Sequence, residues 1–339
     1  MSGDRIDAAI AAANAPFAEV GVTWTVGEGA PRFELYHFAL SLCSQKVRVC
    51  LAEKGAAYTG HDINLSMPLL ANYDPAYVRL RLMGRPGGGF ATGYTGRSSV
   101  ESEGFDPAVV PTLVDLEARE VVTDSARICR HIDRVVAPEG SLVPELLAEA
   151  IDRELAIVDG TPHVALLYGA HPDGDFRPAR LQKGMPGVHD RKIEKIRAAR
   201  DLVLDDAELV SAYDAKIAKE EAGRGFVHDP ERMRTAVREV VEIVGALEDR
   251  LADGRTWVCG DAFTLADVVW SVSLFRLKWI GAAFAWEGGH ALNGEARAHV
   301  ADYVARAIAR PAFVSAAIRW PGMPESEFVA EHYPDRQAL

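Results

Sequence analysis

Cysteine is scarce in this sequence, which has four in 339 residues: Cys43, Cys50, Cys129 and Cys259. No two of them have the C-x-x-C spacing of a dithiol redox motif or of a zinc-binding pair. Four cysteines are also too few for a disulfide framework in a chain of this length. The low cysteine content indicates a reducing compartment, and we expect the protein to be cytoplasmic.

Positive charge is in deficit as well. Lys and Arg total 37 against 49 Asp and Glu, which gives a net charge of −12. Such a chain repels nucleic acids and anionic membranes, so we expect neither as a partner. Long apolar runs are lacking too. No stretch is long enough to span a membrane, and the first residues have neither the basic nor the leucine-rich segment of a signal peptide.

The composition is that of a globular enzyme, with 48% hydrophobic and 25% charged residues and a length typical of two domains. The first third alternates strands with helices, and the chain from about Pro144 onward has helical periodicity. We therefore expect an α/β layer with a mixed sheet, followed by an all-helical domain. The expected strands are 33–38, 57–65, 109–115 and 120–122, and the expected helices are 43–54, 124–132, 148–158, 193–204, 233–251, 265–280 and 296–308.

This pattern predicts three parts: an N-terminal extension (1–31), the α/β domain (32–138) and the helical domain (139–339). The α/β domain has a long insertion at about 67–106, which is rich in arginine and glycine. A connection of this length is unusual. It is either a plain surface excursion or a lid near the active site whose arginines meet an anionic ligand, and the sequence supports both equally.

Cys43 is the most informative residue, because it stands where an aromatic strand and a small-residue turn give way to a helix. A thiol at a helix start meets unpaired backbone N–H groups and the positive end of the helix dipole. Lys46 and Arg48 add positive charge, so we expect a depressed pKa and a reactive thiolate. The alternative is a buried structural cysteine. The other three cysteines have the surroundings of inert thiols.

Two more sites follow along the chain. Pro111 lies within an apolar strand and cannot donate to a sheet, so it is expected at an edge or in a special geometry such as a cis bond. A cis bond would leave the backbone of Val110 free to pair with an extended, peptide-like ligand. Asp124 and Ser125 stand at a helix start, where they either cap the helix or bind a ligand carboxylate.

In this order, these features resemble the cytosolic glutathione transferases. The resemblance covers about residues 32–320 and implies a thioredoxin-like domain followed by an all-α domain, with glutathione as co-substrate. In that family the residue before the cis-proline pairs with the cysteinyl backbone of glutathione, and an acidic-Ser pair holds its γ-glutamyl end. These roles fall on Val110, Pro111, Asp124 and Ser125. The segment Thr264-Leu265-Ala266-Asp267 matches the family's N-capping box. We also expect a homodimer.

A narrower resemblance is to the bacterial reductive dehalogenases of chlorinated hydroquinones, on segments 41–48, 77–82, 102–107 and 161–170. It implies that glutathione adds to an activated hydroquinone with loss of chloride. Cys43 then attacks the sulfur of the aryl thioether, and a second glutathione releases Cys43 from the mixed disulfide. Ser41 either donates a hydrogen bond to the glutathione sulfur or only caps the helix.

The aromatic substrate needs an apolar slot with a few polar groups, and the helical domain offers Tyr168, His171, Trp279 and also His163. The spacing of Trp279 favours a place in the helix core. His171 lies close in sequence to Asp173 and Asp175, but the rest of a ligand set is missing, so we expect no metal.

Three functions remain open. The first is glutathione-dependent reductive dehalogenation, and the second is an aryl-ether-cleaving or thioether-processing transferase reaction that uses the same Cys43. The third is a non-catalytic interaction protein with a glutathione-transferase-like fold. The joint presence of Cys43, the Val110-Pro111 pair and the Asp124-Ser125 pair speaks against the third, because an interaction protein has no need of an intact thiol site.

Overall fold

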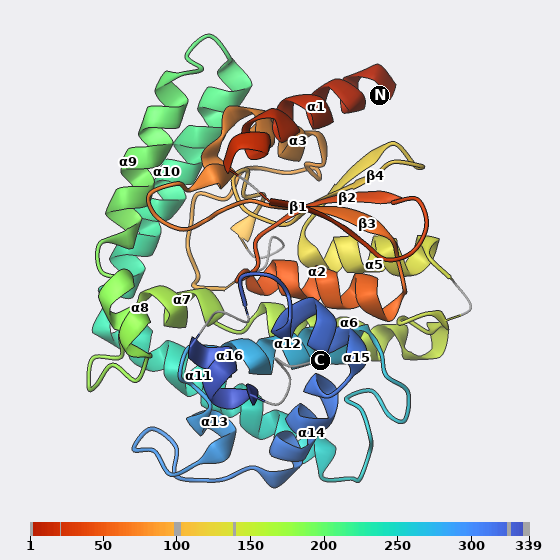
Figure 1. Cartoon of the computed structure of the whole chain (residues 1–339). Helices are drawn as coiled ribbons and strands as arrows, with labels where there is room; N and C mark the ends of the chain where they lie inside the picture. Colours follow the sequence, from red (N-terminus) through yellow and green to blue (C-terminus); the bar gives the residue numbers. More distant parts are fainter. Residues whose placement is uncertain (1–2, 21, 98–102, 138–139, 324–326, 335–339) are drawn as a thin grey trace.

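A mixed five-stranded sheet is the centre of the N-terminal half (Figure 1). The computed structural model describes residues 3–20, 22–97, 103–137, 140–323 and 327–334. The strands lie in the order β1-β3-β2-β4-β5; β2 and β3 run parallel, and the other neighbouring pairs run antiparallel. Their bounds are β1 Val22–Val26, β2 Phe33–His37, β3 Tyr58–Asp62, β4 Thr112–Asp115 and β5 Glu120–Thr123.

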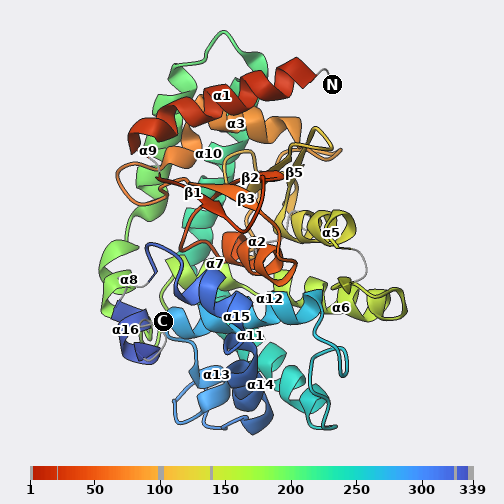
Figure 2. The ribbon, with the colours of Figure 1, turned by 45° about the vertical axis from the view of Figure 1, so that its right-hand side comes forward.

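Helices cover both faces of this sheet (Figures 1 and 2). Helices α2 (Leu42–Glu53) and α5 (Ser125–Val135) pack together on one face, and α1 (Gly3–Val20) and α3 (Pro75–Met83) lie on the other. The order β2-α2-β3-α3-β4-β5-α5 is the thioredoxin-like arrangement, so the expected fold class of the first domain is confirmed.

Much of segment 1–31 is built into this domain. It forms α1 and β1, and β1 pairs antiparallel with β3, with Val22 opposite Asp62 and Val26 opposite Tyr58. The described part of α1 is tied down by the Tyr36 hydroxyl, which donates to Asn14 Oδ1 at 2.7 Å. The sequence pattern did not predict either element.

The rest of the chain is helical, as expected, and α12 lies at its centre with almost every residue buried. Its start is the predicted N-capping box: the Thr264 amide donates to Asp267 Oδ2 at 2.8 Å, which satisfies a backbone group that the helix cannot pair. The main helices are α6 Ala148–Asp159, α7 His163–Tyr168, α8 Ala179–Gly184, α9 Val188–Asp201, α10 Ala207–Val227, α11 Pro230–Leu251, α12 Leu265–Trp279, α13 Phe284–Glu287, α14 Ala298–Ile308, α15 Pro311–Phe313 and α16 Glu327–His332.

Helices α9 and α10 form a hairpin that stands beside α3 in both views of the ribbon (Figures 1 and 2). The Tyr213 hydroxyl joins the hairpin to the first domain by donating to the backbone oxygen of Tyr73 at 2.8 Å. Periodicity did not predict α10, because its buried face includes the charged residues Lys216 and Glu220. Burial of those charges requires partners from another part of the chain.

Within the part of the chain that the structure describes, no helix is both long and apolar enough to cross a membrane. Three serines of the segments discussed above, Ser98, Ser99 and Ser102, lie outside the described residues.

Candidate active site

A cavity of about 530 Å³ lies between the two domains. Ser41 before α2 and Cys43 in its first turn line one side of it, and Val110, two residues before β4, also lines it. Tyr168 and Trp279 of the helical domain line the other side. The cavity therefore brings together the thiol, one predicted glutathione-binding residue and part of the predicted substrate side, whereas Pro111, Asp124 and Ser125 are not among its lining residues.

Cys43 lies in the first turn of α2 and is partly exposed. Ser41 caps the helix, because its hydroxyl accepts a hydrogen bond from the Ser44 amide at 3.3 Å. The Cys43 sulfur shares a hydrogen bond with the side chain of Ser125, at the start of α5. The thiol thus sits where the N-terminal ends of α2 and α5 meet.

The prediction of a depressed Cys43 pKa was wrong in direction. Burial is the largest influence and raises the pKa of the thiol; Lys46 acts against it, but Asp159 and Asp124 raise it further. Arg48 points away from the cavity and donates to the backbone oxygens of Ala316 and Ala39, each at 2.9 Å. Of the two basic neighbours in sequence, only Lys46 lowers the pKa of the thiol.

The Val110-Pro111 peptide bond is cis, one of the geometries expected for this pair. In the described part of the chain, no hydrogen bond pairs the backbone amide or carbonyl of Val110, although Tyr77 binds the carbonyl of Val109 and Arg81 that of Pro111. The backbone of Val110 at the cavity wall is therefore open to an extended ligand.

Asp124 is the N-cap of α5 and accepts from the amides of Ala126 and Arg127 at 3.0 and 3.2 Å. Its φ of 73° and ψ of 130° are rare for a residue with a side chain, which is a strain that commonly marks a functional site. Burial raises the pKa of its carboxyl, and Asp159 adds to that effect. Ser125 beside it is buried at 4% exposure.

The substrate-side candidates fall into two groups. Tyr168, Trp279 and His163 line the cavity, whereas His171 is not part of its lining. His171 is buried elsewhere and accepts from the amide of Asp173 at 3.3 Å. Burial lowers the pKa of His163 to about 3, and its Nε2 lies 2.8 Å from the Ser273 hydroxyl, so this histidine is neutral at physiological pH.

The insertion reaches the cavity: Tyr94, Glu103 and Asp106 are among its lining residues. This position fits the lid interpretation. Two of its arginines serve other partners: Arg81 is buried and donates to the backbone oxygen of Asp106 at 2.8 Å, and Arg79 pairs with an acid of the α9–α10 hairpin. These two are therefore not free to meet a ligand, whereas Arg97 lines the cavity, with a carboxylate oxygen of Glu239 at 3.5 Å.

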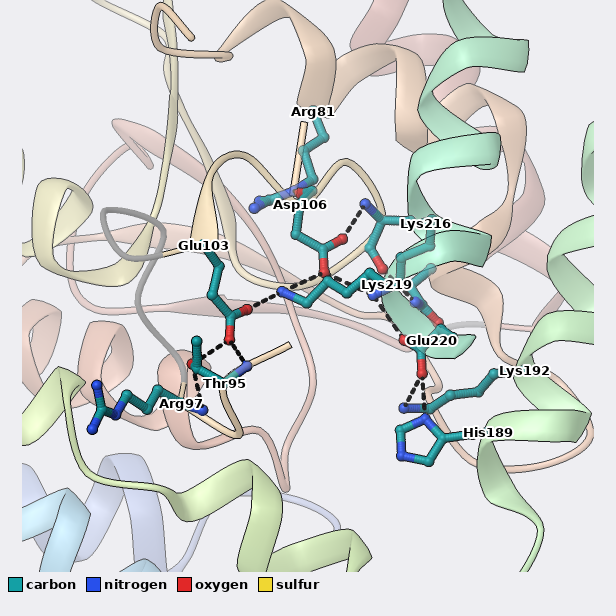
Figure 3. Close-up of polar contacts among 12 residues, drawn as sticks. Arg81, Thr95, Arg97, Glu103, Asp106, His189, Lys192, Lys216, Lys219 and Glu220 are labelled. Carbon is teal, nitrogen blue, oxygen red and sulfur yellow. Dashed lines mark hydrogen bonds and ion pairs between the residues drawn. The ribbon is translucent and has the colours of Figure 1, made fainter. Parts of the chain in front are cut away.

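A buried ionic network holds the insertion against the α9–α10 hairpin (Figure 3). Lys216 lies 2.7 Å from Asp106 and 3.0 Å from Glu220, and Lys219 pairs with Glu103 of the insertion. Figure 3 shows Glu220 continuing the chain to His189, at 2.8 Å. These cations are matched by acids, so we assign the network a structural role at the far wall of the cavity.

Sequence reasoning missed Arg276, which lines the cavity from the last turns of α12 and is 4% exposed. Its guanidinium bonds the backbone oxygen of Leu40 and lies 3.4 Å from Gln45 Oε1. These two residues flank Cys43 in the chain. No sequence pattern indicates this contact, because an arginine near a helix C-terminus is usually a surface residue.

The fold and the cavity agree with the comparisons with known proteins. A family model described as the N-terminal domain of glutathione S-transferase matches residues 40–135, and one described as the C-terminal domain matches residues 208–306. The chain belongs to the glutathione S-transferase family and is an enzyme of that family.

A particular relative is similar over most of the chain. It is the 2,5-dichlorohydroquinone reductive dechlorinase of Sphingobium indicum, 44% identical over 88% of this chain and 86% of the relative. The tetrachloro-p-hydroquinone reductive dehalogenase of Sphingobium chlorophenolicum is 24% identical over 86% of this chain and 99% of its own length. Among solved structures, a beta-etherase from Sphingobium sp. strain SYK-6 matches with a TM-score of 0.55 at 19% identity, covering 84% of this chain and 98% of that one, which shows the fold.

Proposed function

We propose that this protein removes chloride reductively from chlorinated hydroquinones, with 2,5-dichlorohydroquinone as the first substrate to test and glutathione as the reductant. The observation that carries the proposal is the position of Cys43, partly exposed at a helix start in the cavity between the two domains. The 44% identity to a 2,5-dichlorohydroquinone reductive dechlorinase supports the choice of substrate.

Glutathione would lie along the wall formed by the first domain. The unpaired backbone of Val110, held by Pro111, would pair with its cysteinyl backbone. Asp124 and Ser125 would hold the γ-glutamyl end, where the positive end of the α5 dipole favours its carboxylate. This arrangement directs the glutathione sulfur toward Ser41 and Cys43.

The aromatic ring would lie across the cavity, between the thiol and the helical domain. Tyr168 and Trp279 offer aromatic faces for it, and the neutral His163 adds a polar but uncharged edge. The role of Ser41 as helix cap is visible in the structure. A hydrogen bond from the same hydroxyl to the glutathione sulfur is part of the proposal.

The reaction then has three steps, each of which uses a thiolate. Glutathione thiolate adds to an activated form of the hydroquinone, and chloride leaves. Cys43 thiolate attacks the sulfur of the aryl thioether; the aryl carbon keeps the bonding electron pair and takes up a proton, which leaves a Cys43–glutathione disulfide. A second glutathione thiolate attacks that disulfide, releases oxidised glutathione and restores Cys43.

The balance of these steps is one chloride and one oxidised glutathione for each aryl chloride replaced by hydrogen. The test incubates the protein with glutathione and 2,5-dichlorohydroquinone and measures chloride, oxidised glutathione and the aromatic product. Equal amounts of all three are expected. Chloride release with only a stable glutathione conjugate would indicate a plain transferase, and no turnover together with an unreactive Cys43 would favour an interaction protein.

A further inference from the structure

Arg276 is a buried cation without an acidic partner. In the described residues, no carboxylate lies within ion-pair distance of its guanidinium, although the side chain is 4% exposed. Its Nε has no hydrogen-bond partner there either. A buried charge of this kind is costly, so an anion in the cavity would stabilise it.

The neighbours of Arg276 show where in the cavity such an anion would bind. The guanidinium bonds the backbone oxygen of Leu40 and lies 3.4 Å from Gln45 Oε1, so it spans the turn that holds Cys43. Its Cζ lies over the indole of Trp279, 4.6 Å from the ring centroid, and the Trp279 indole N–H has no partner among the described residues. Both residues line the cavity beside the thiol.

Burial lowers the pKa of Arg276 to about 10, and the group that most opposes this is Cys43, followed by Tyr168. Arg180 provides the contrast: it stacks on the same indole at 4.9 Å, but its charge is supported by Glu327 and Glu331 instead. The two arginines thus differ in their partners. Burial lowers the pKa of both, but two carboxylates oppose this decrease at Arg180, whereas Cys43 and Tyr168 of the active site oppose it at Arg276.

The charged groups around Cys43 come from several elements. Lys46 of α2 acts as a cation, and Asp124 before α5 and Asp159 of α6 act as anions. Lys46 is already paired with Asp159 at 2.7 Å. Arg276 is therefore the cation near the thiol that no carboxylate neutralises among the described residues.

We propose that Arg276 is the counter-ion of the Cys43 thiolate. It acts as a positioning residue that holds the Cys43 turn in place and favours the charged sulfur during attack on the thioether. The inference rests on the proposed role of Cys43 and deepens it. Where burial and two nearby carboxylates oppose the thiolate, Arg276 supplies the compensating charge from the second domain.

The test is the rate at which iodoacetamide alkylates Cys43 as a function of pH, followed by peptide mass mapping. Replacement Arg276→Gln should raise the pH midpoint by about one unit, with a roughly tenfold slower reaction below it, because one cation close to the sulfur is lost. Arg180→Gln, the matched control that also contacts the Trp279 indole, should leave the midpoint unchanged. Equal midpoints for Arg276→Gln and the parent protein would overturn the proposal.

Two further readouts keep the test decisive. If Arg276→Gln does not fold, Arg276→Lys retains the charge and should keep the midpoint within a few tenths of a unit of the parent; a rise of about one unit would overturn the proposal. If Arg276 instead serves an oxyanion of the hydroquinone, hydroquinone binding would weaken with no change in the thiol midpoint, which also overturns it. Alkylation of Cys43 does not require turnover, so this test can be read even if the protein does not dechlorinate the hydroquinone.

Discussion

Lys46 and Asp159 form a buried ion pair, 2.7 Å long, one helical turn from Cys43. The pair joins α2 of the first domain to α6 of the second. Asp159 offsets part of the effect of Lys46, so Lys46 lowers the pKa of Cys43 less than it would alone. The reactivity of Cys43 therefore depends on how the two domains pack.

The first prediction concerns this pair. Replacement Asp159→Asn removes a carboxylate that raises the Cys43 pKa and leaves Lys46 unneutralised, so the pKa should fall. The pH midpoint for alkylation should move down, and the reaction at neutral pH should become several-fold faster. Asp152→Asn, an exposed change on the same helix, is the control. An upward shift in Asp159→Asn would contradict this electrostatic description.

The second prediction concerns the nucleophile. Replacement Cys43→Ser should leave the addition of glutathione possible but stop the attack on the thioether, because a hydroxyl is a poor nucleophile toward sulfur. A glutathionyl hydroquinone should accumulate, which liquid chromatography with mass spectrometry would detect. Cys259→Ser, at a partly exposed cysteine outside the cavity lining, is the control and should turn over normally. Full turnover by Cys43→Ser would remove Cys43 from the mechanism.

The third prediction separates capping from ligand binding at Ser125. Loss of a hydrogen bond to a charged carboxylate costs on the order of 1.5–3 kcal/mol, or roughly tenfold and more in affinity. Replacement Ser125→Ala should therefore raise the glutathione requirement more than the hydroquinone requirement. Calorimetry with glutathione measures the effect, with the exposed Ser315→Ala as control. Unchanged glutathione affinity would show that Ser125 has no part in binding it.

The fourth prediction concerns the network in Figure 3. Lys216 is buried between Asp106 and Glu220, at 2.7 and 3.0 Å, so Lys216→Met leaves two carboxylates short of a partner. The free energy of unfolding should fall by about 3–5 kcal/mol, measured by urea denaturation. The exposed change Lys195→Met should have little effect. An equal loss in both variants would show that the network adds nothing specific.

The same network predicts a pH dependence of stability. Nearby lysines hold the pKa values of Asp106 and Glu220 below their ordinary range in the folded protein. Their stabilisation is complete above the unfolded values of about 3.9 and 4.3, and is lost as the pH falls toward the folded values. Stability should therefore drop below about pH 4, and more steeply in the parent protein than in Lys216→Met. Identical acid profiles would contradict this.

Local patterns predicted much of the site and of the fold. The helix start at Cys43, the capping box that begins at Thr264 and the apolar faces of α11 and α12 depend on neighbours in sequence, so the sequence alone indicated them. The backbone geometry at Val110 followed from the placement of a proline in an apolar run.

Long-range packing could not be predicted in the same way. Arg48 and Lys46 are close in sequence to Cys43, but only the fold shows that Arg48 stacks on Trp320, at 4.7 Å, instead of facing the thiol. Arg276 reaches the Cys43 turn from a distant helix. The apolar periodicity of α10 is interrupted by buried charged residues, and their burial depends on partners from the insertion.

The most direct measurement of the central claim is single-turnover mapping of disulfides. The protein is mixed with one equivalent of the glutathionyl hydroquinone, without free glutathione, then quenched with acid and digested. We expect a glutathione disulfide on Cys43, formed in equal amount to the released hydroquinone. Release of hydroquinone without that disulfide, or a disulfide on Cys259 instead, would contradict it.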